Sequence, residues 1–268
     1  MNEIHLIPTA GLCNRMRAIA SAVYIAKYLD LPLLILWNKY KGLNAMFSDL
    51  FEPINIKNIS LEETNKWKYS INFKRDYLLR KILLLNYKQI LYNINVWDGD
   101  KVFNKIKTCN GKLLFISCSQ MSKMYALNKL FVPTYDIKKI LDKITNNFTP
   151  NTIGIHVRRT DNTMSIKGSP LEGFIKIIDN EIINNNNVSF YLASDDEQVK
   201  EFIKNKYGDR IFSYSMELTR DSLDGMKMAV AELFALSRTS KIIGSYYSSY
   251  SQIAAELGNI AIEYVRNK

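Results

Sequence analysis

Polar and charged side chains follow three apolar segments in the second half of the 268-residue chain. The three stretches read IGIHVRRTD, FYLASDD and GSYYSSYS, at Ile153–Asp161, Phe190–Asp196 and Gly244–Ser251. Arginine suits phosphate because its planar guanidinium donates two parallel hydrogen bonds. Free N–H groups at a helix N-terminus, with serine hydroxyls beside them, bind anions as well. These residue types therefore predict a site for a phosphate-bearing ligand.

The first of these stretches is the most informative. Alternation along an extended chain would point His156 and Arg158 to one face and Arg159 to the other. The simpler interpretation is a strand end with a surface salt bridge between Arg159 and Asp161. For the other two stretches, the simpler interpretation is helix capping, by Asp196 or by a serine. Three polar strand ends in one half of the chain favour a shared site.

A further candidate loop lies near the start of the chain, where Pro8–Arg15 reads PTAGLCNR. A strand that passes through a glycine turn into a helix leaves N–H groups free for an anion. Gly11 permits close backbone approach, and Arg15 and Arg17 add positive charge. The alternative is an ordinary turn with a solvated arginine. The dinucleotide fingerprint is incomplete, because its second and third glycines are missing.

The elements that must position these loops alternate along the chain. Strands are predicted at Ile4–Ile7, Leu33–Leu36, Ile153–Val157, Val188–Ala193, Arg210–Ser213 and Lys241–Gly244, and a last strand or turn at Ile260–Tyr264. Helices are predicted at Cys13–Leu29, Leu171–Ile183, Glu197–Lys206, Leu223–Ser237 and Ser251–Leu257. Such alternation predicts an α/β fold with parallel sheets. Ligands of these folds bind beyond the carboxyl ends of the strands.

The chain is long enough for two domains. A polar stretch with a proline at Asn146–Asn151 predicts a boundary between a domain at 1–148 and a second at 149–268. The first domain contains a basic and strongly apolar stretch, Arg75–Ile94, that favours a helix. Such a helix could lie on an anionic membrane surface. The alternative is a core helix whose lysines and arginines extend to solvent.

The composition limits the classes of partner and site. A net charge of +10 and a pI near 9.3 favour phosphates, nucleic acid or an anionic membrane surface as partners. The basic residues form no nucleic-acid reader motif, so no nucleic-acid partner is expected. Three cysteines without Cys-x-x-Cys spacing and only two histidines argue against disulfides and a metal site. Without a signal peptide or an apolar run of ~20 residues, the expected location is cytoplasmic, or peripheral at the inner face of the membrane.

Taken together, the motifs resemble the GDP-fucose-dependent fucosyltransferase superfamily, which includes α1,2-, α1,6- and protein O-fucosyltransferases. IGIHVRRTD, FYLASDD and the segment Asp221–Gly258 carry the resemblance, which is strongest to the α1,6 type. GLCNRMRAIASA at Gly11–Ala22 resembles the family's N-terminal Gly-x-x-Asn loop. The resemblance covers about residues 150–258, and more weakly 4–36.

The resemblance implies a GT-B type fold of two Rossmann-like domains and an inverting, metal-independent transfer of fucose from GDP-fucose to a glycan acceptor. It implies that Arg158 holds the β-phosphate, that Glu232 reads the guanine edge, and that Gly11 and Asn14 close over the phosphates from the N-terminal domain. The implied catalytic residues are Arg158, Asp161 and Asp195. The implied donor-binding residues are Gly11, Asn14, Arg15, His156, Arg158, Arg159, Asp196, Glu232, Tyr247, Ser248 and Ser249.

One departure from the α1,6 pattern concerns the general base. In those members a lysine follows the motif and a catalytic glutamate comes a few residues later. Here Asn162 follows, Thr163–Lys167 holds no carboxylate, and the next acid after Asp161 is Glu172. The base is therefore open between Asp161, Glu172 and a residue of the middle of the chain. The gap keeps open a non-catalytic homologue that binds GDP-sugar, and the net charge of +10 keeps open a basic nucleic-acid-binding protein.

Overall fold

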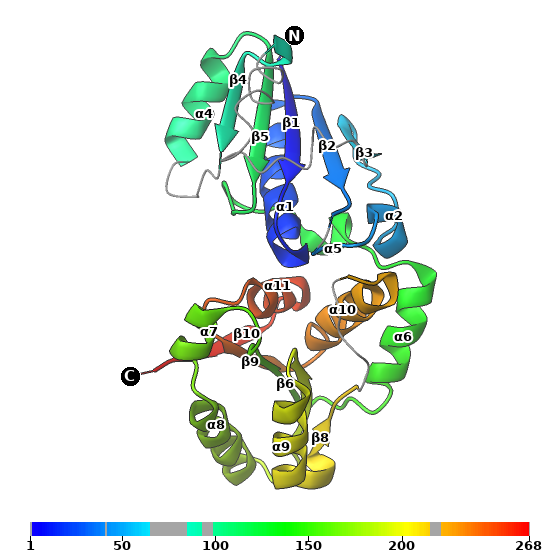
Figure 1. The fold of residues 1–268 in the computed structure, drawn as a ribbon, viewed down its shortest axis with the longest axis vertical. Helices are drawn as coiled ribbons and strands as arrows, with labels where there is room; N and C mark the ends of the chain where they lie inside the picture. Colours follow the sequence, from blue (N-terminus) through cyan, green and yellow to red (C-terminus); the bar gives the residue numbers. More distant parts are fainter. Residues whose placement is uncertain (1, 41, 65–84, 93–98, 215–220, 268) are drawn as a thin grey trace. The chain divides into compact units, whose positions relative to one another are not determined.

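The protein divides into two compact units (Figure 1). The computed structural model describes residues 2–40, 42–64, 85–92, 99–214 and 221–267, with only the backbone of residues 99–102. Met1–Thr134 and Arg220–Met226 form the first unit, and Tyr135–Thr219 and Lys227–Lys268 form the second. Helix α6, at Tyr135–Thr145, belongs to the second unit, whereas the boundary suggested by the sequence assigns it to the first.

The first unit is built on a parallel sheet of strand order β3-β2-β1-β5-β4 within the described residues. Its strands are β1 (Glu3–Pro8), β2 (Leu33–Asn38), β3 (Ile59–Thr64), β4 (Gln89–Tyr92) and β5 (Lys112–Ser117). Its helices are α1 (Leu12–Leu29), α2 (Phe47–Leu50), α4 (Gly99–Thr108) and α5 (Leu127–Leu130). Helix α1 ends where Asp30 adopts the left-handed conformation.

The helix predicted at Arg75–Ile94 is wrong over Gln89–Tyr92, which form β4. Residues 75–84 and 93–94 lie outside the described residues. A short apolar run fits a buried helix and a buried strand equally well, and pairing with β5 decides for the strand. None of the described helices is long and apolar enough to cross a membrane.

The second unit is built on a parallel sheet of strand order β10-β9-β6-β7-β8. Its strands are β6 (Thr152–Val157), β7 (Ser189–Ser194), β8 (Ile211–Phe212), β9 (Lys241–Ser245) and β10 (Ala261–Val265). Its helices, besides α6, are α7 (Thr163–Gly168), α8 (Leu171–Asn184), α9 (Glu197–Tyr207), α11 (Ser249–Gly258) and most of α10 (Leu223–Leu236). The α/β fold with parallel sheets that the sequence predicted is confirmed.

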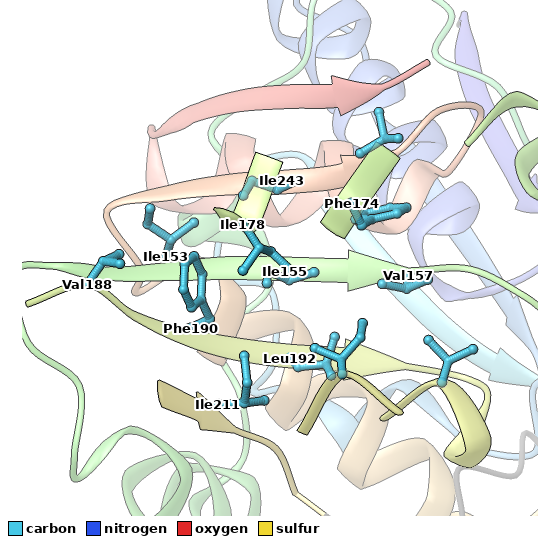
Figure 2. Close-up of a cluster of buried hydrophobic side chains, with 13 residues drawn as sticks. Ile153, Ile155, Val157, Phe174, Ile178, Val188, Phe190, Leu192, Ile211 and Ile243 are labelled. Atoms are coloured by element: carbon cyan, nitrogen blue, oxygen red, sulfur yellow. The ribbon is translucent and has the colours of Figure 1, made fainter. Parts of the chain in front are cut away.

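One face of this second sheet carries a continuous apolar core (Figure 2). Ile155 of β6 and Phe190 of β7 are fully buried there, together with Phe174 and Ile178 of α8. Side chains that alternate along β6 and β7 reach this face at every second position. Burial of each such side chain contributes about 1.5–3 kcal/mol. This core keeps β6 and β7 in register, so their carboxyl ends stay side by side.

The other face of the sheet accommodates helices through two glycines. A Cβ on Gly244 would lie 2.6 Å from the Cβ of Ser251 in α11. A Cβ on Gly154 would lie 2.8 Å from the Thr239 hydroxyl and 3.0 Å from a methyl group of Leu236. Real Cβ atoms do not approach neighbours so closely, so the two glycines are needed for this close helix-to-sheet packing.

Candidate functional site

The polar loops that follow β6, β7 and β9 are joined by hydrogen bonds. The N–H of Arg158 donates to Ser245 Oγ at 2.9 Å, which connects the ends of β6 and β9. The N–H of Arg159 donates to Asp195 Oδ1 at 2.7 Å, which connects β6 to β7. These strands are direct neighbours in the sheet, so the three loops form one site at its carboxyl edge.

The carboxylate of Asp195 is the centre of this site. It accepts hydrogen bonds from the N–H of Arg159 at 2.7 Å, from the N–H of Thr160 at 3.3 Å and from the Thr160 hydroxyl at 2.5 Å. Arg158 Nη1 lies 2.9 Å from Asp195 Oδ2. Burial alone would raise the pKa of Asp195, but the Thr160 hydroxyl, the guanidinium of Arg158 and the two N–H groups together lower it. Asp195 is therefore an ionised group whose acceptor capacity is used within the site.

The guanidinium of Arg158 lies between two carboxylates of different exposure. Its Nη1 pairs with Asp195, whose side chain is 14% exposed, and its Nη2 pairs with Asp161, whose side chain is 53% exposed. The buried partner fixes the orientation of the guanidinium.

Arg159 turns to the opposite face, as the alternation predicted. Its Nη2 donates to the Ser169 carbonyl at 2.9 Å, its Nη1 donates to the Arg158 carbonyl at 3.1 Å, and its guanidinium lies 5.8 Å from the centre of the Phe174 ring. Arg159 thus braces the loop through its side chain. The surface salt bridge considered for Arg159 and Asp161 is replaced by a pair between Arg158 and Asp161.

His156 is a residue of β6, and its side chain contacts α11. Its Nδ1 is 2.7 Å from Ser251 Oγ, and its ring stacks on Tyr250 with centroids 4.8 Å apart. Burial, assisted by the positive charge of Arg158, lowers the pKa of His156 to about 3. The imidazole is therefore neutral near pH 7 and holds α11 against β6.

Two helices, α9 and α11, begin directly after the strands of this site. Asp196 caps α9, because its Oδ1 accepts from the N–H groups of Gln198 at 2.9 Å and Val199 at 3.3 Å. Ser248 occupies the N-cap position of α11 without a side-chain cap, and Ser249 begins that helix. The capping interpretation thus describes the Asp196 side chain, while the N-terminus of α11 retains N–H groups that can face a ligand.

Glu232 is a residue of α10 and is 2% exposed. The hydroxyl of Tyr191 donates to its Oε1 at 3.5 Å. Burial raises the pKa of Glu232 to about 7, although the charge of Lys200 and the Tyr191 hydroxyl oppose the rise. The carboxyl is thus poised to change its protonation state near neutral pH.

Replacing Glu232 with glutamine is expected to change how stability depends on pH. An unfolded glutamate has a pKa of about 4.3, so the folded state binds this proton more tightly. The wild-type protein therefore loses stability as pH rises from about 4.5 through about 7. Glu232→Gln lacks this loss and should gain up to about 3 kcal/mol relative to wild type between pH 4.5 and 8. Urea unfolding at several pH values measures the gain.

The exposed Glu201 on α9 offers the matched control for this comparison. Glu201→Gln should leave the difference from wild type nearly constant across the same pH range. A constant difference for Glu232→Gln as well would contradict the raised pKa.

In the first unit, the buried side chain of Arg15 stabilises the loop at Pro8–Arg15, which we call the glycine loop. It is 2% exposed, its Nε donates to the Ala10 carbonyl at 3.1 Å, and its Nη1 donates to the Asn38 carbonyl at 2.7 Å. The guanidinium lies 4.7 Å from the Trp37 ring and 5.0 Å from the Tyr40 ring. Burial lowers its pKa to about 10, against the opposing effect of Tyr40. The alternative of a solvated arginine is therefore wrong.

The glycine loop itself has the geometry of an open helix start. Ala10 holds a φ of +62°, which the hydrogen bond from Arg15 supports, and Gly11 is the N-cap of α1. No acidic residue stands in the first turn of α1, and no side chain caps it. The half-buried Asn14 belongs to this first turn. A helix start of this kind leaves N–H groups for an anion.

The residues predicted from the sequence fall into three groups in the structure. It connects the Arg158, Asp161 and Asp195 side chains directly, and the Asn162 amide donates to the Tyr247 carbonyl at 3.0 Å. His156, Arg159 and Asp196 support this edge, as do Ser248 and Ser249 at the start of α11, while Glu232 lies in α10. Gly11, Asn14 and Arg15 belong to the first unit.

Two buried serines that the sequence did not single out also support the site. Ser245 Oγ accepts from Arg158 and donates to the His156 carbonyl at 3.3 Å, so a fully buried hydroxyl fixes the backbone of the arginine. Ser169 Oγ accepts from the N–H of Tyr246 at 2.7 Å and donates to the Val265 carbonyl at 2.7 Å. A serine directly at a strand end was the only available signal for Ser245, and serine is common in turns.

Known structures share this fold. NodZ α1,6-fucosyltransferase soaked with GDP-fucose aligns with a TM-score of 0.64 and 16% sequence identity, over 96% of this chain and 93% of that chain. An Arabidopsis thaliana FUT1 mutant in complex with GDP aligns with a TM-score of 0.65 and 16% identity, over 99% and 71%. POFUT1 in complex with GDP aligns with a TM-score of 0.55 and 12% identity, over 98% and 98%.

At these identities the likeness establishes the fold, a GT-B type α/β architecture with two parallel sheets. The resemblance inferred from the motifs is confirmed at the level of the fold. No family model matches the chain, and no curated protein matches it.

Proposed function

We propose that this protein is a glycosyltransferase that transfers fucose from GDP-fucose to a glycan acceptor, with inversion and without a metal ion. The observation that carries the proposal is the guanidinium of Arg158, held by Asp195 at the carboxyl edge of a parallel sheet. The fold is shared with proteins whose structures contain GDP or GDP-fucose, which supports this choice of donor.

The chemistry requires stabilisation of a leaving diphosphate. An oxygen of the acceptor attacks C1 of the sugar, and the bond from C1 to the β-phosphate oxygen breaks with its electron pair staying on GDP. Arg158 and the N–H groups at the start of α11 supply positive charge where the negative charge develops. Fixed donors of this kind do the work that a metal ion does in other transferases.

The acceptor hydroxyl must lose a proton, and Asp161 is the better candidate for the base. Both carboxylates pair with Arg158, but Asp195 also accepts three hydrogen bonds, so it has little capacity for a further proton donor. Asp161 is the more exposed of the two, with 53% of its side chain accessible. We therefore assign Asp161 as the base and Asp195 as a positioning residue.

The test of the proposal is the stabilisation of the full chain by nucleotides. A ligand that binds only the folded state raises its apparent stability, by about 2.7 kcal/mol at a hundred times its Kd. GDP is expected to raise the melting temperature, whereas UDP and CMP at the same concentration are expected to have little effect. A melting temperature that does not respond to millimolar GDP would contradict the proposal.

Two further assays, GDP release and a gel shift, separate the alternative functions. A non-catalytic homologue would be stabilised by GDP but would release no GDP from GDP-fucose in the presence of acceptor glycans. The stretch Thr163–Lys167, which holds no carboxylate where the α1,6 pattern has its catalytic glutamate, motivates this alternative. A nucleic-acid-binding protein would show a salt-dependent gel shift and no response to GDP.

A further inference from the structure

Tyr247 is an exposed aromatic residue in a constrained backbone conformation. It follows β9, its side chain is 57% exposed, and its φ is +57°. Bulky residues seldom adopt this left-handed region, and they do so where the surrounding structure enforces it. The reason for the conformation must therefore lie in the contacts around the loop.

Those contacts hold the backbone of Tyr247 from the neighbouring loop. Asn162 Nδ2 donates to the Tyr247 carbonyl at 3.0 Å, and Asn162 Oδ1 accepts from the N–H of Ser165 at 3.1 Å. The second bond fixes the amide of Asn162, so the first bond has a defined direction. Asn162 is thus a connection between the loop that carries Arg158 and the loop that carries Tyr247.

Other contacts hold the ring itself. The rings of Tyr246 and Tyr247 have centroids 4.1 Å apart, and the guanidinium of Arg266 lies 4.4 Å from the centre of the Tyr246 ring. The Tyr247 ring also lies close to Gly168, where a Cβ would be 3.9 Å from its Cδ2. An aromatic ring that is backed in this way loses little freedom when a ligand covers it.

The loop that carries Tyr247 is joined to the loop that carries Arg158. Tyr247 comes two residues after Ser245, which binds the backbone of Arg158, and Asn162 comes four residues after Arg158. The sugar of a nucleotide sugar is bonded directly to its β-phosphate. A β-phosphate at Arg158 therefore places the sugar near the residues that border the edge.

We propose that the ring of Tyr247 packs against the sugar of the nucleotide-sugar donor, and that Asn162 is the positioning residue that holds it. This inference rests on the proposed function for the location of the phosphate. A hexose presents a face of C–H groups between its hydroxyls, and an ordered tyrosine offers an apolar surface with a polar tip to such a face. GDP lacks the sugar, so Tyr247 should contribute to the affinity for GDP-fucose and little to that for GDP.

The experiment compares the Kd of GDP with the Kd of GDP-fucose by calorimetry on the full chain. Tyr247→Ala is expected to weaken GDP-fucose about 3- to 10-fold relative to GDP, since aromatic packing has this magnitude. Tyr247→Phe should preserve the wild-type ratio of the Kd of GDP-fucose to the Kd of GDP. Asn162→Ser, which retains an acceptor for Ser165 but is too short to reach Tyr247, should shift the ratio in the same direction as Tyr247→Ala.

A matched control uses the exposed Tyr135 of α6, in the same unit. Tyr135→Ala should leave both dissociation constants unchanged. Retained GDP affinity shows that a variant is folded, and Tyr247→Leu replaces the alanine variant if that one fails to fold. An unchanged ratio in Tyr247→Ala or Tyr247→Leu overturns the inference and leaves the proposed function standing. Failure of the wild type to bind GDP overturns both.

Discussion

Replacing Arg158 with alanine is expected to lower sugar transfer by about 10²- to 10³-fold, the usual cost of removing one fixed donor from a developing negative charge. The guanidinium is oriented by Asp195, and its position at the edge suits a leaving diphosphate. Most of the loss should fall on kcat, because the interaction strengthens as the bond to GDP breaks. The rate of GDP release from GDP-fucose with acceptor present measures the effect.

Arg238 provides the matched control for the Arg158 variant. It lies in the same unit and pairs with Asp142 at 3.2 Å, but 46% of its side chain is exposed. Arg238→Ala should retain near wild-type transfer, because exposed ion pairs contribute little to stability. Arg158→Ala with full activity, and with the far-ultraviolet circular dichroism of wild type, would refute the assigned role. The transfer rate of Arg158→Lys should lie between those of Arg158→Ala and Arg238→Ala, because a lysine cannot donate two parallel hydrogen bonds.

Replacing Asp195 with asparagine is expected to lower transfer on the order of 10²-fold, because small displacements of catalytic groups have effects of that size. An asparagine would present an NH₂ group to donors of Arg158 and Thr160 that now share a carboxylate oxygen. The guanidinium of Arg158 would lose its orientation. Both kcat and the affinity for GDP should therefore fall, which calorimetry and initial rates measure separately.

Asp161→Asn distinguishes a positioning carboxylate from a base. If Asp161 takes the proton, this variant should keep its affinity for GDP while kcat falls. Asp142→Asn is the control, because Asp142 is an exposed carboxylate that also pairs with an arginine. The reverse pattern, in which Asp195→Asn retains GDP affinity and loses kcat while Asp161→Asn loses GDP affinity, would exchange the two roles.

The second unit could be predicted well from the sequence because its central strands β6, β7 and β9 are buried on both faces. All six residues of β6 are buried, so its apolar run and the change to polar residues at Arg158 mark the strand end clearly. The edge strand β3 gives no such signal, since only Ile59 and Thr64 of its six residues are buried. Strand β4 was predicted as a helix because its apolar residues extend a longer apolar run.

The site could be predicted only at the level of residue types. Parallel strands bring their carboxyl ends to one edge, so Arg158, Asp161 and Asp195 were expected to meet there. The division between an exposed and a buried carboxylate depends on peptide groups of Arg159 and Thr160, whose orientation no sequence pattern specifies. The burial of Arg15 likewise depends on aromatic side chains from β2 and the loop after it.

Gly154 and Gly244 have a consequence for how variant libraries of this protein should be interpreted. Larger residues at either position would push Leu236 or Ser251 away from the sheet and displace α10 or α11. Such variants would lose turnover although neither glycine touches a reactant. A functional screen alone would group these two positions with Arg158. A parallel measurement of protein abundance would distinguish variants that lose folded protein from variants that lose only activity.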